Sequence, residues 1–372
     1  MAVPGTIQTY DMTVGVMLDV EPIIALLSPQ DLPLQGFMSA SGYSALGAED
    51  VFEKKKEWTD EELLTRRSNL AASATTTGTV LTMAAGDGIA FGTGDIILIS
   101  GEYIQVTGYG TTTDTLIVAR AFGGSSALAL ATSALVMGVG QALAEGSDPP
   151  AARVRDRVDR FNYTQVYGPH AITVSGTENA IRKYGIATTE FDHQVVNRVK
   201  EAGIDFEQAL LYGLLFAGTA NGGRTMGGFA NYIVSNVSGA TQITDSTLLD
   251  LIEDCYDLGG NPDTVLAGFH QRRAISQINS TDIRYEQSTN VRGQRVATYV
   301  SDAGELNIIL DRWAAPSDLF LYARDQASIG TLRPLHFGML AQTGDAQKGM
   351  VVGEKTLIFR RQQHAGRMNS LV

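Results

Sequence analysis

The residues that most often carry catalysis or bind metals are few and scattered in this chain. Histidine, a common general base and metal ligand, occurs at five separated positions: His170, His193, His270, His336 and His364. None of them forms an HExxH pair, and the single cysteine, Cys255, excludes an internal disulfide and a zinc site built from cysteines. Because Cys255 lies on the apolar side of "LLDLIEDCYDLGG", we expect a buried thiol. We therefore predict no metal and no cofactor.

Other catalytic motifs have equally little support. The stretch "GDGIAFG" (86–92) has the glycines of a phosphate-binding loop, but neither a basic residue nor a helical pattern follows it. The stretch "NGGRTMGGF" (221–229) contains Arg224, yet strand-like residues follow, so we expect a tight turn with no helix. Adjacent carboxylates such as Glu61 and Glu62 do not converge on one side of a helix. We predict that the protein is not an enzyme.

The densest group of chemically active side chains is a run of charges. The stretch "EKKKEWTDEELLTRRSNL" (53–70) has ten charged residues in its first fifteen, in blocks of one sign around Trp58. A solvated surface is the ordinary interpretation of such a run. A large aromatic residue beside arginines is typical of the centre of a protein interface. Both interpretations remain open at this point.

The composition limits the class of partner. The chain has 372 residues, 44% of them hydrophobic and 18% charged, so it can bury a substantial core. Its net charge of −12 argues against sequence-specific binding of nucleic acid. No export signal and no run of membrane-spanning length is visible, so we expect a soluble protein made inside the cell.

The elements that must position these residues are of mixed type. Residues 1–50 form no core of their own and contain one short helical pattern, Val20–Leu27. Between residues 71 and 147 short β-type runs alternate with glycine-rich turns, which predicts an inserted β-sandwich or barrel. A long helix is predicted over residues 189–217, with Gly203 as a position where it could bend. A second helix is predicted with Ser246 as N-cap and Gly259 as C-cap.

The last third of the chain predicts an α+β arrangement. "TVLAG" (264–268) has the pattern of a buried strand and "FHQRRAISQI" (269–278) that of a helix. Four strand-like runs follow, namely "RVATYVSD", "LNIILDRW", "DLFLYARD" and "KGMVVGEKTLIFRRQ".

Six short blocks, in this order, resemble the major capsid proteins of tailed bacteriophages. They are "LSPQDLPL" (27–34), "EWTDEEL" (57–63), "NYTQVYGPHAITVSGTENA" (162–180), "IDFEQALLYG" (204–213), "RTMGGFANYI" (224–233) and "QKGMVVGEKTLIFRRQQHAG" (347–366). Each block is weakly specific alone, but the six together span nearly the whole chain. A turn at "RAFGG" (120–124) departs from the usual pattern, which affects only the local turn.

The resemblance implies the fold shared by tailed-phage and herpesvirus capsids, here with an inserted β-sandwich or barrel. Its parts would be an N-terminal arm, an extended loop, a peripheral domain with a long spine helix, and an axial domain. The corresponding residues are 1–50 for the arm, 51–70 and 151–175 for the loop, 71–147 for the insert, 176–223 and 336–372 for the peripheral domain, and 224–335 for the axial domain.

The resemblance also implies a function. Copies of the chain would assemble into hexamers and pentamers of an icosahedral shell that encloses viral double-stranded DNA without reading its sequence. The implied partners are further copies, a portal protein, and separate scaffolding or decoration proteins; the protein would be assembled in the host cytoplasm and reside in the virion, with no membrane. We then expect the charge run to face an adjacent subunit. The contact candidates are Lys54, Lys55, Lys56, Glu57, Trp58, Asp60, Glu61, Glu62, Arg66 and Arg67.

Two alternatives stay open. A carbohydrate- or receptor-binding module would place exposed aromatic residues on one face of the insert, with Phe91, Tyr103, Tyr109 and Phe122 as candidates. An enzyme with a site between subunits would cluster titratable groups near residues 221–228, where only Arg224 is available. The insert itself could clamp neighbouring capsomers, receive decoration proteins, or serve only its own folding.

Overall fold

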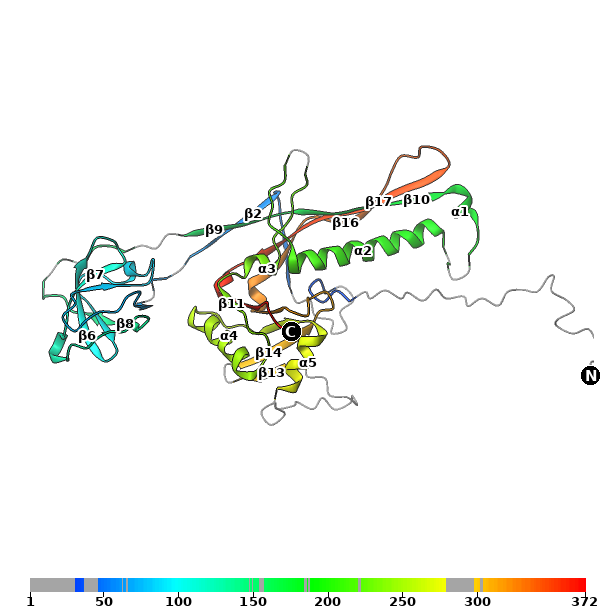
Figure 1. Ribbon diagram of the computed structural model, residues 1–372. Helices are drawn as coiled ribbons and strands as arrows, with labels where there is room; N and C mark the ends of the chain where they lie inside the picture. Colours follow the sequence, from blue (N-terminus) through cyan, green and yellow to red (C-terminus); the bar gives the residue numbers. More distant parts are fainter. Residues whose placement is uncertain are drawn as a thin grey trace, which may run out of the picture. The chain divides into compact units, whose positions relative to one another are not determined.

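The computed structural model has an α+β fold, as expected (Figure 1). The residues that it describes are 31–36, 46–61, 63–64, 66–146, 148, 150–153, 157–183, 186, 188–219, 222–278, 298–301 and 304–372. The chain divides into two compact units, residues 1–58 with 161–372 and residues 59–160. The helix expected over Val20–Leu27 lies outside the described residues.

The larger unit contains a four-stranded sheet with the order β1-β16-β17-β10. Its strands are β1 (Gly47–Asp50), β16 (Ala327–Met339), β17 (Ala346–Phe359) and β10 (Gln165–Ser175). The strand β1 runs parallel to β16, whereas β16, β17 and β10 are antiparallel neighbours. The region expected as one return strand of a loop, residues 151–175, therefore contributes its second half to this sheet.

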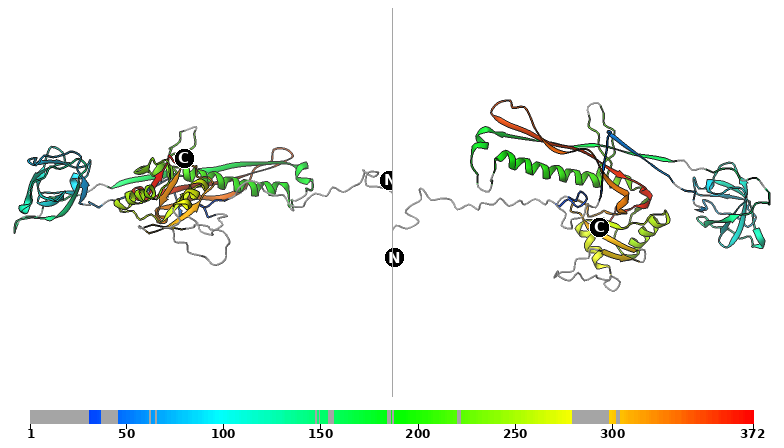
Figure 2. Two further views of the ribbon diagram at one scale, coloured as in Figure 1. Left: turned by 60° about the horizontal axis from the view of Figure 1, so that its bottom comes forward. Right: turned by 180° about the vertical axis from the view of Figure 1, so that it is seen from behind.

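The predicted long helix is α2 (Glu190–Tyr212), which runs along β10 and β17 (Figure 2). The Thr189 hydroxyl caps it by accepting from the Asp192 amide, and the short helix α1 (Gly176–Ala180) precedes it. The helix ends at Tyr212, before the expected end at residue 217. Gly213 leaves the helix with extended backbone angles (φ −55°, ψ 140°), and a Cβ there would lie 2.5 Å from the carbonyl oxygens of Ala209 and Met226, so only glycine fits at this exit.

The helix is also closely packed at Gly203. A Cβ at this position would lie 2.8 Å from Leu32 Cδ1, so the glycine makes room for a side chain from the N-terminal region. The sequence predicts Gly203 as a possible bend, whereas in the structure it lies inside the continuous helix α2 and allows this approach.

A second sheet of six strands has the order β11-β18-β15-β12-β14-β13. Its strands are β11 (Asn236–Ser238), β18 (Gly366–Met368), β15 (Leu319–Tyr322), β12 (Thr264–Ala267), β14 (Gly304–Leu310) and β13 (Thr298–Ser301). The expected buried strand is confirmed, because all four residues of β12 are buried. The helices α4 (Asp245–Asp257) and α5 (Phe269–Gln277) pack with this sheet, and short 3₁₀ turns lie at Arg324–Gln326 and Gln362–His364.

Two local predictions in this region need correction. The N-cap of α4 is Thr244 and not Ser246, because Thr244 and Thr247 form a reciprocal capping box. The glycine-rich stretch is followed by a short helix, α3 (Phe229–Tyr232), although we expected none. Phe229 and Tyr232 are buried, so packing favours the helical turn despite its strand-like composition. The buried state expected for Cys255 is confirmed.

The smaller unit is a six-stranded antiparallel barrel with the order β3-β8-β5-β6-β7-β4. Its strands are β3 (Arg67–Asn69), β8 (Leu135–Gln141), β5 (Asp95–Ile99), β6 (Glu102–Tyr109), β7 (Thr115–Ala119) and β4 (Val80–Thr82), with 3₁₀ turns at Gly88–Ala90 and Phe122–Gly124. A bridge between Leu70 and Met83 joins the two outer strands and closes the sheet. The barrel thus begins at β3, earlier than the expected residue 71.

Two further strands, β2 (Lys55–Asp60) and β9 (Val158–Tyr163), pair with each other and connect the two units. We call this pair the ribbon. It carries four of the ten charged residues of the run singled out in the sequence, namely Lys55, Lys56, Glu57 and Asp60, and the other six flank β2.

Candidate assembly surface

The acidic block of the ribbon is matched by arginines on its returning strand. Arg157 Nε lies 3.4 Å from Glu61 Oε1, and Arg160 Nε lies 4.0 Å from Asp60 Oδ2. Beside them, the Thr59 hydroxyl donates to Asp159 Oδ1 at 2.8 Å. The Arg157–Glu61 pair is mostly exposed, so it contributes little to folding. Its charges remain accessible to another molecule.

The basic block lies at the other end of β2. The Lys55 ammonium pairs with Glu57 and lies 4.2 Å from the centre of the Phe161 ring on β9. Lys54 is exposed, and its carbonyl accepts from the Thr164 amide at 2.9 Å. Burial would raise the pKa of Glu49, but hydrogen bonds from Ser328 and Arg360 lower it, with a smaller contribution from the charge of Lys56. A basic block at the start of β2 and an acidic block at its end therefore lie on one accessible strand.

The arginine block belongs to the barrel. Arg66 Nη2 lies 3.6 Å from Asp95 Oδ1, a carboxylate that is fully buried and also accepts from Arg153 Nη1 at 2.8 Å. Arg67 is exposed on β3, opposite Met137. Glu62, another contact candidate, lies outside the described residues. Arg66 thus has a partner inside its own unit.

Trp58 packs against the core of its own chain. Its ring lies 5.9 Å from the ring of Tyr232, and the side chain is half-buried against the apolar cluster around Phe229 and Phe359. The indole Nε1 is buried and has no hydrogen-bond partner. The aromatic residue at the centre of the charge run therefore anchors the base of the ribbon.

Asn162 supplies a second anchor. Its side chain is fully buried; Oδ1 accepts from the Gly227 amide at 2.9 Å, while Nδ2 donates to the carbonyls of Gly227 at 3.0 Å and Leu357 at 2.7 Å. These bonds connect β9 to the turn before α3 and to β17. The Tyr232 hydroxyl adds a bond to the Phe161 carbonyl at 2.7 Å.

A buried carboxylate next to the ribbon base organises three more segments. Glu354 on β17 accepts from the Thr164 hydroxyl at 2.7 Å, from Arg333 Nε at 3.0 Å, and from the Arg224 guanidinium. Burial alone would raise the pKa of Glu354, but the Thr164 hydroxyl and the two arginines lower it below its ordinary value. Arg224, the one titratable residue of the glycine-rich loop, is thereby occupied in a structural ion pair.

The sequence analysis did not single out Asn162, Tyr232 or Glu354. A signal existed for Glu354, because a carboxylate within the apolar run "VVGEKTLIF" must find partners when the strand is buried. Asn162 lies in a block quoted for the resemblance, but its partners are far away in the sequence. These hydrogen bonds join residues that are 65 and 195 positions apart in the sequence, and local patterns cannot predict contacts over such separations.

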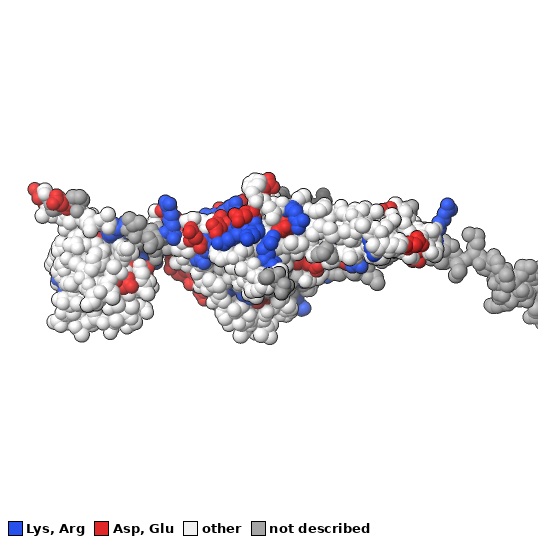
Figure 3. All heavy atoms as spheres, turned by 90° about the horizontal axis from the view of Figure 1, so that it is seen from above, with Lys and Arg blue, Asp and Glu red and all other residues white. Residues whose placement is uncertain are grey.

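The barrel buries an ion pair, and its outer face carries apolar and aromatic side chains beside the exposed Arg67. Glu102 is fully buried and is bound by Arg120 through two hydrogen bonds of 2.8 and 2.6 Å. On the outside, Met137, Leu98 and Tyr103 lie in register on three neighbouring strands. Figure 3 shows this unit almost free of charged groups on the face in view, whereas charges of both signs gather on the larger unit.

The aromatic candidates of the barrel do not form a stacking platform. Phe91 is fully buried in the barrel core. Tyr103 and Tyr109 are exposed but lie six residues apart on β6, about 20 Å along the strand. Tyr109 also donates its hydroxyl to the Phe91 carbonyl at 2.7 Å. No observation in the described barrel favours the carbohydrate-binding alternative.

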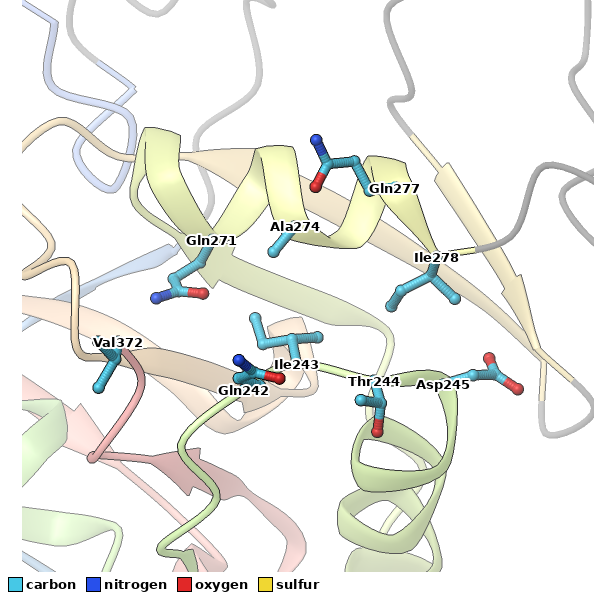
Figure 4. Close-up of a pocket in the computed structure, with 9 residues that line it drawn as sticks. All are labelled: Gln242, Ile243, Thr244, Asp245, Gln271, Ala274, Gln277, Ile278 and Val372. Atoms are coloured by element: carbon cyan, nitrogen blue, oxygen red, sulfur yellow. The ribbon is translucent and has the colours of Figure 1, made fainter.

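A groove of 580 Å³ lies between α5 and the start of α4 (Figure 4). Its lining is neutral apart from Asp245, whose carboxylate accepts from the Tyr299 hydroxyl and points away from Gln242 and Gln271 in Figure 4. Within the described residues no group of histidine, cysteine and carboxylate side chains is arranged to hold a metal ion. This groove therefore offers no set of catalytic groups.

None of the helices in the described part of the chain combines the length and apolarity that a membrane crossing requires.

Solved structures of other proteins are similar to this chain in fold. The chain is similar to the capsid of Myoviridae phage XM1, at 11% identity and a TM-score of 0.50, over 96% of this chain and 100% of that one. A structure from Mycobacterium phage Bobi has 10% identity and a TM-score of 0.49, over 98% of each chain. The holo-SrpI encapsulin complex of Synechococcus elongatus PCC 7942 has 9% identity and a TM-score of 0.41, over 59% of this chain and 78% of that one. At such identities, the XM1 likeness concerns the fold alone.

No curated protein matches the chain. The sequence model of the family described as SU10 major capsid protein, however, matches residues 5–372, which is nearly the whole chain. The resemblance to phage major capsid proteins is thereby confirmed. The chain belongs to the SU10 major capsid protein family and is a bacteriophage capsid protein.

Proposed function

We propose that copies of this chain assemble into hexamers and pentamers, which form an icosahedral shell around viral double-stranded DNA. Family membership supports this function. The structural observation that carries it is the ribbon, which pairs only two strands in the described chain. A two-stranded ribbon is marginally stable in water without further cover. The surface of a neighbouring copy would supply that cover.

The contact would use the charges of the ribbon. Lys54, Glu57 and Glu61 are exposed, with Lys55 beside Glu57 and Arg157 beside Glu61. Complementary charges set register and partner choice more than affinity. One exposed pair contributes about 0.2–1 kcal/mol, but repetition over many copies makes the sum large. Trp58 and Arg66, which have partners within their own chain, would support the surface from inside.

The charge of the chain suits a container for DNA. A net charge of −12 favours low affinity for phosphate backbones, so the shell would enclose DNA without sequence-specific binding. A portal protein, a separate scaffolding protein and decoration proteins would be further partners. Assembly would take place in the host cytoplasm, and the product would be part of the virion.

We assign roles to the parts of the chain on the same basis. Residues 1–50 would reach across neighbouring subunits, the ribbon would be the core of the extended loop, and α2 with β10 and β17 would form the peripheral domain. The six-stranded sheet with α4 and α5 would belong to the axial domain, where copies meet at the centre of each capsomer.

The barrel would clamp a neighbouring capsomer. Support comes from the outer face with Leu98, Tyr103 and Met137, where the exposed Arg67 opposite Met137 would attract another acidic chain. Replacement of residues 75–145 by a short linker tests this role. We expect shells that form but break at lower temperature; shells of unchanged stability would reject the clamp.

Electron microscopy of the full chain, expressed alone and purified, tests the assembly itself. Closed shells or isolated hexamers and pentamers are expected. A monomer or small dimer at every concentration would contradict the proposal.

A further inference from the structure

A short N-terminal segment, residues 31–36, is held on the spine helix by one buried carboxyl. The Leu34 amide donates to Glu207 Oε1 at 2.7 Å, and Gln35 Nε2 donates to Glu207 Oε2 at 2.8 Å. Gln35 Nε2 also donates to the Gly203 carbonyl at 2.8 Å. Leu32 and Leu34 are almost fully buried beside these bonds. Both oxygens of Glu207 are thus committed to one segment.

A second buried carboxyl faces the same region. Asp311, which follows β14, is fully buried; its Oδ1 accepts from the Trp313 amide at 2.8 Å, and its Oδ2 has no hydrogen-bond partner. Trp313 Nε1 donates to the Asp31 carbonyl at 3.0 Å, so this carboxyl also supports the segment. A buried oxygen without a donor indicates a site that is costly to ionise.

The charged and titratable groups that influence Glu207 come from three neighbouring elements. They are Asp311 after β14, Tyr322 on β15 and Lys355 on β17. The Tyr322 hydroxyl is buried without a partner, and Lys355 Nζ lies 4.9 Å from the centre of the Phe206 ring. From the segment itself, Asp31 pairs with Arg312 at 3.3 Å, on the exposed surface. Neither Lys355 nor Arg312 forms an ion pair with Glu207 within 4 Å, so its charge is compensated chiefly by the hydrogen bonds from residues 34 and 35, whose lowering of the pKa is smaller than the increase due to burial.

We propose that Glu207 and Asp311 form a proton-controlled clasp, which holds residues 31–36 while the pair carries a proton and releases them when both carboxyls are ionised. Residues 1–30 are connected to the rest of the chain through this segment. The clasp would therefore control how firmly the start of the chain is attached to the spine helix. Both carboxyls belong to one chain, so the device does not depend on assembly.

The titration of the pair agrees with this geometry. Burial, followed by the charge of Asp311, raises the pKa of Glu207 to about 8, and burial raises the pKa of Asp311 to about 6. A carboxyl with a raised pKa binds more protons in the packed state than in the released state. The packed state therefore loses stability as pH rises, up to the raised pKa. Attachment is firmest in mild acid and weakest above pH 8.

Hydrogen exchange at the Leu34 amide tests the proposal in the full-length protein. After correction for the intrinsic exchange rate, protection should fall on the order of tenfold between pH 6 and pH 9. The Gly227 amide, which donates to the uncharged Asn162, provides an internal control without this dependence. Equal protection of Leu34 at both pH values would overturn the proposal.

Two variants separate the clasp from general effects of alkaline pH. Glu207→Gln keeps the size of the side chain but cannot ionise, so the pH dependence at Leu34 should disappear. Asp311→Asn removes the neighbouring charge, so the dependence should become weaker. An unchanged pH dependence in both variants would overturn the proposal. If Glu207→Gln does not fold, Asp311→Asn alone decides, because an undiminished dependence there also contradicts the clasp. Exchange can be measured on unassembled chains, so failure of shell assembly leaves this test intact.

Discussion

Asn162 and Gly227 hold each other by two reciprocal hydrogen bonds, although 65 residues separate them in the sequence. The amide side chain uses its acceptor and one of its donors on the backbone of a single glycine, and reaches Leu357 as well. These bonds fix the base of the ribbon to the core of the larger unit. The surface proposed for assembly is thus supported by a fully buried polar contact.

Asn162→Ala should destabilise the larger unit by about 2–4 kcal/mol, because it removes three buried hydrogen bonds to the backbone of Gly227 and Leu357. Both tryptophans, Trp58 and Trp313, belong to this unit, so urea unfolding followed by tryptophan fluorescence reports on it selectively. Asn261→Ala, at an exposed asparagine of the same unit, is the matched control and should change stability by less than about 0.5 kcal/mol. Equal effects of the two variants would refute the anchoring role.

Glu354→Gln should weaken the larger unit by about 2 kcal/mol near neutral pH, because charge-assisted bonds to Arg224 and Arg333 become neutral ones. The pKa of Glu354 is lowered, so its stabilisation is present above the ordinary value of 4.5 and is lost as pH falls through the lowered pKa. The variant should therefore lose less stability than the wild type on acidification. Glu53→Gln, at an exposed carboxylate, is the control; a parallel acid response in all three proteins would contradict this role.

Arg120→Ala should unfold the barrel while the larger unit stays folded. The guanidinium bonds the buried Glu102 and the carbonyls of Thr75, Gly78 and Leu128, so its removal leaves an uncompensated charge at a cost of about 3–5 kcal/mol. Hydrogen exchange of the amides of β6 and β7 measures the barrel, and tryptophan fluorescence measures the larger unit. Glu145→Ala, at an exposed charge of the same unit, should leave both signals unchanged. Intact protection in Arg120→Ala would disprove this assignment.

An exchange of charges distinguishes contacts within the chain from contacts between copies. Glu61→Arg combined with Arg157→Glu preserves the pair on the ribbon but inverts the charge pattern that a neighbour meets. We expect a monomer of unchanged stability that assembles more slowly at low salt, because steering by complementary charge is lost. Light scattering during assembly, at two salt concentrations, measures the effect. Assembly at the wild-type rate would show that Glu61 and Arg157 act only within their own chain, and would contradict a contact with a neighbouring copy.

The parts of the fold with regular local patterns could be predicted from the sequence. The helix α2 and the strand β12 have clear apolar patterns, and both were found where they were expected. The strand β16 was missed, because Pro334 and two glycines interrupt its pattern. The structure accommodates Pro334 because β1 pairs only with Ser328–Thr331 of β16, and because the proline lies within a register shift against β17, between Arg333 and His336.

The candidate surface was located by its composition, but its contacts could not be predicted. The charge run is visible as a block of residues, whereas its pairing depends on the register of β2 against β9, about a hundred residues later. The sequence predicts the side chain of Trp58 at an interface, but in the structure it contacts Tyr232. Tyr232 lies in the short helix α3, where the sequence predicts a turn with no helix. Both the pairing of β2 with β9 and the contact of Trp58 with Tyr232 depend on packing between residues that are far apart in the sequence.

The measurement that tests the central claim most directly is electron microscopy of the full chain expressed alone at physiological salt, together with its mass by light scattering. Self-assembly predicts closed icosahedral shells, or hexamers and pentamers that grow with concentration. A monomer or dimer that stays small at high concentration, and after addition of lysate without scaffolding protein, would contradict self-assembly into a shell.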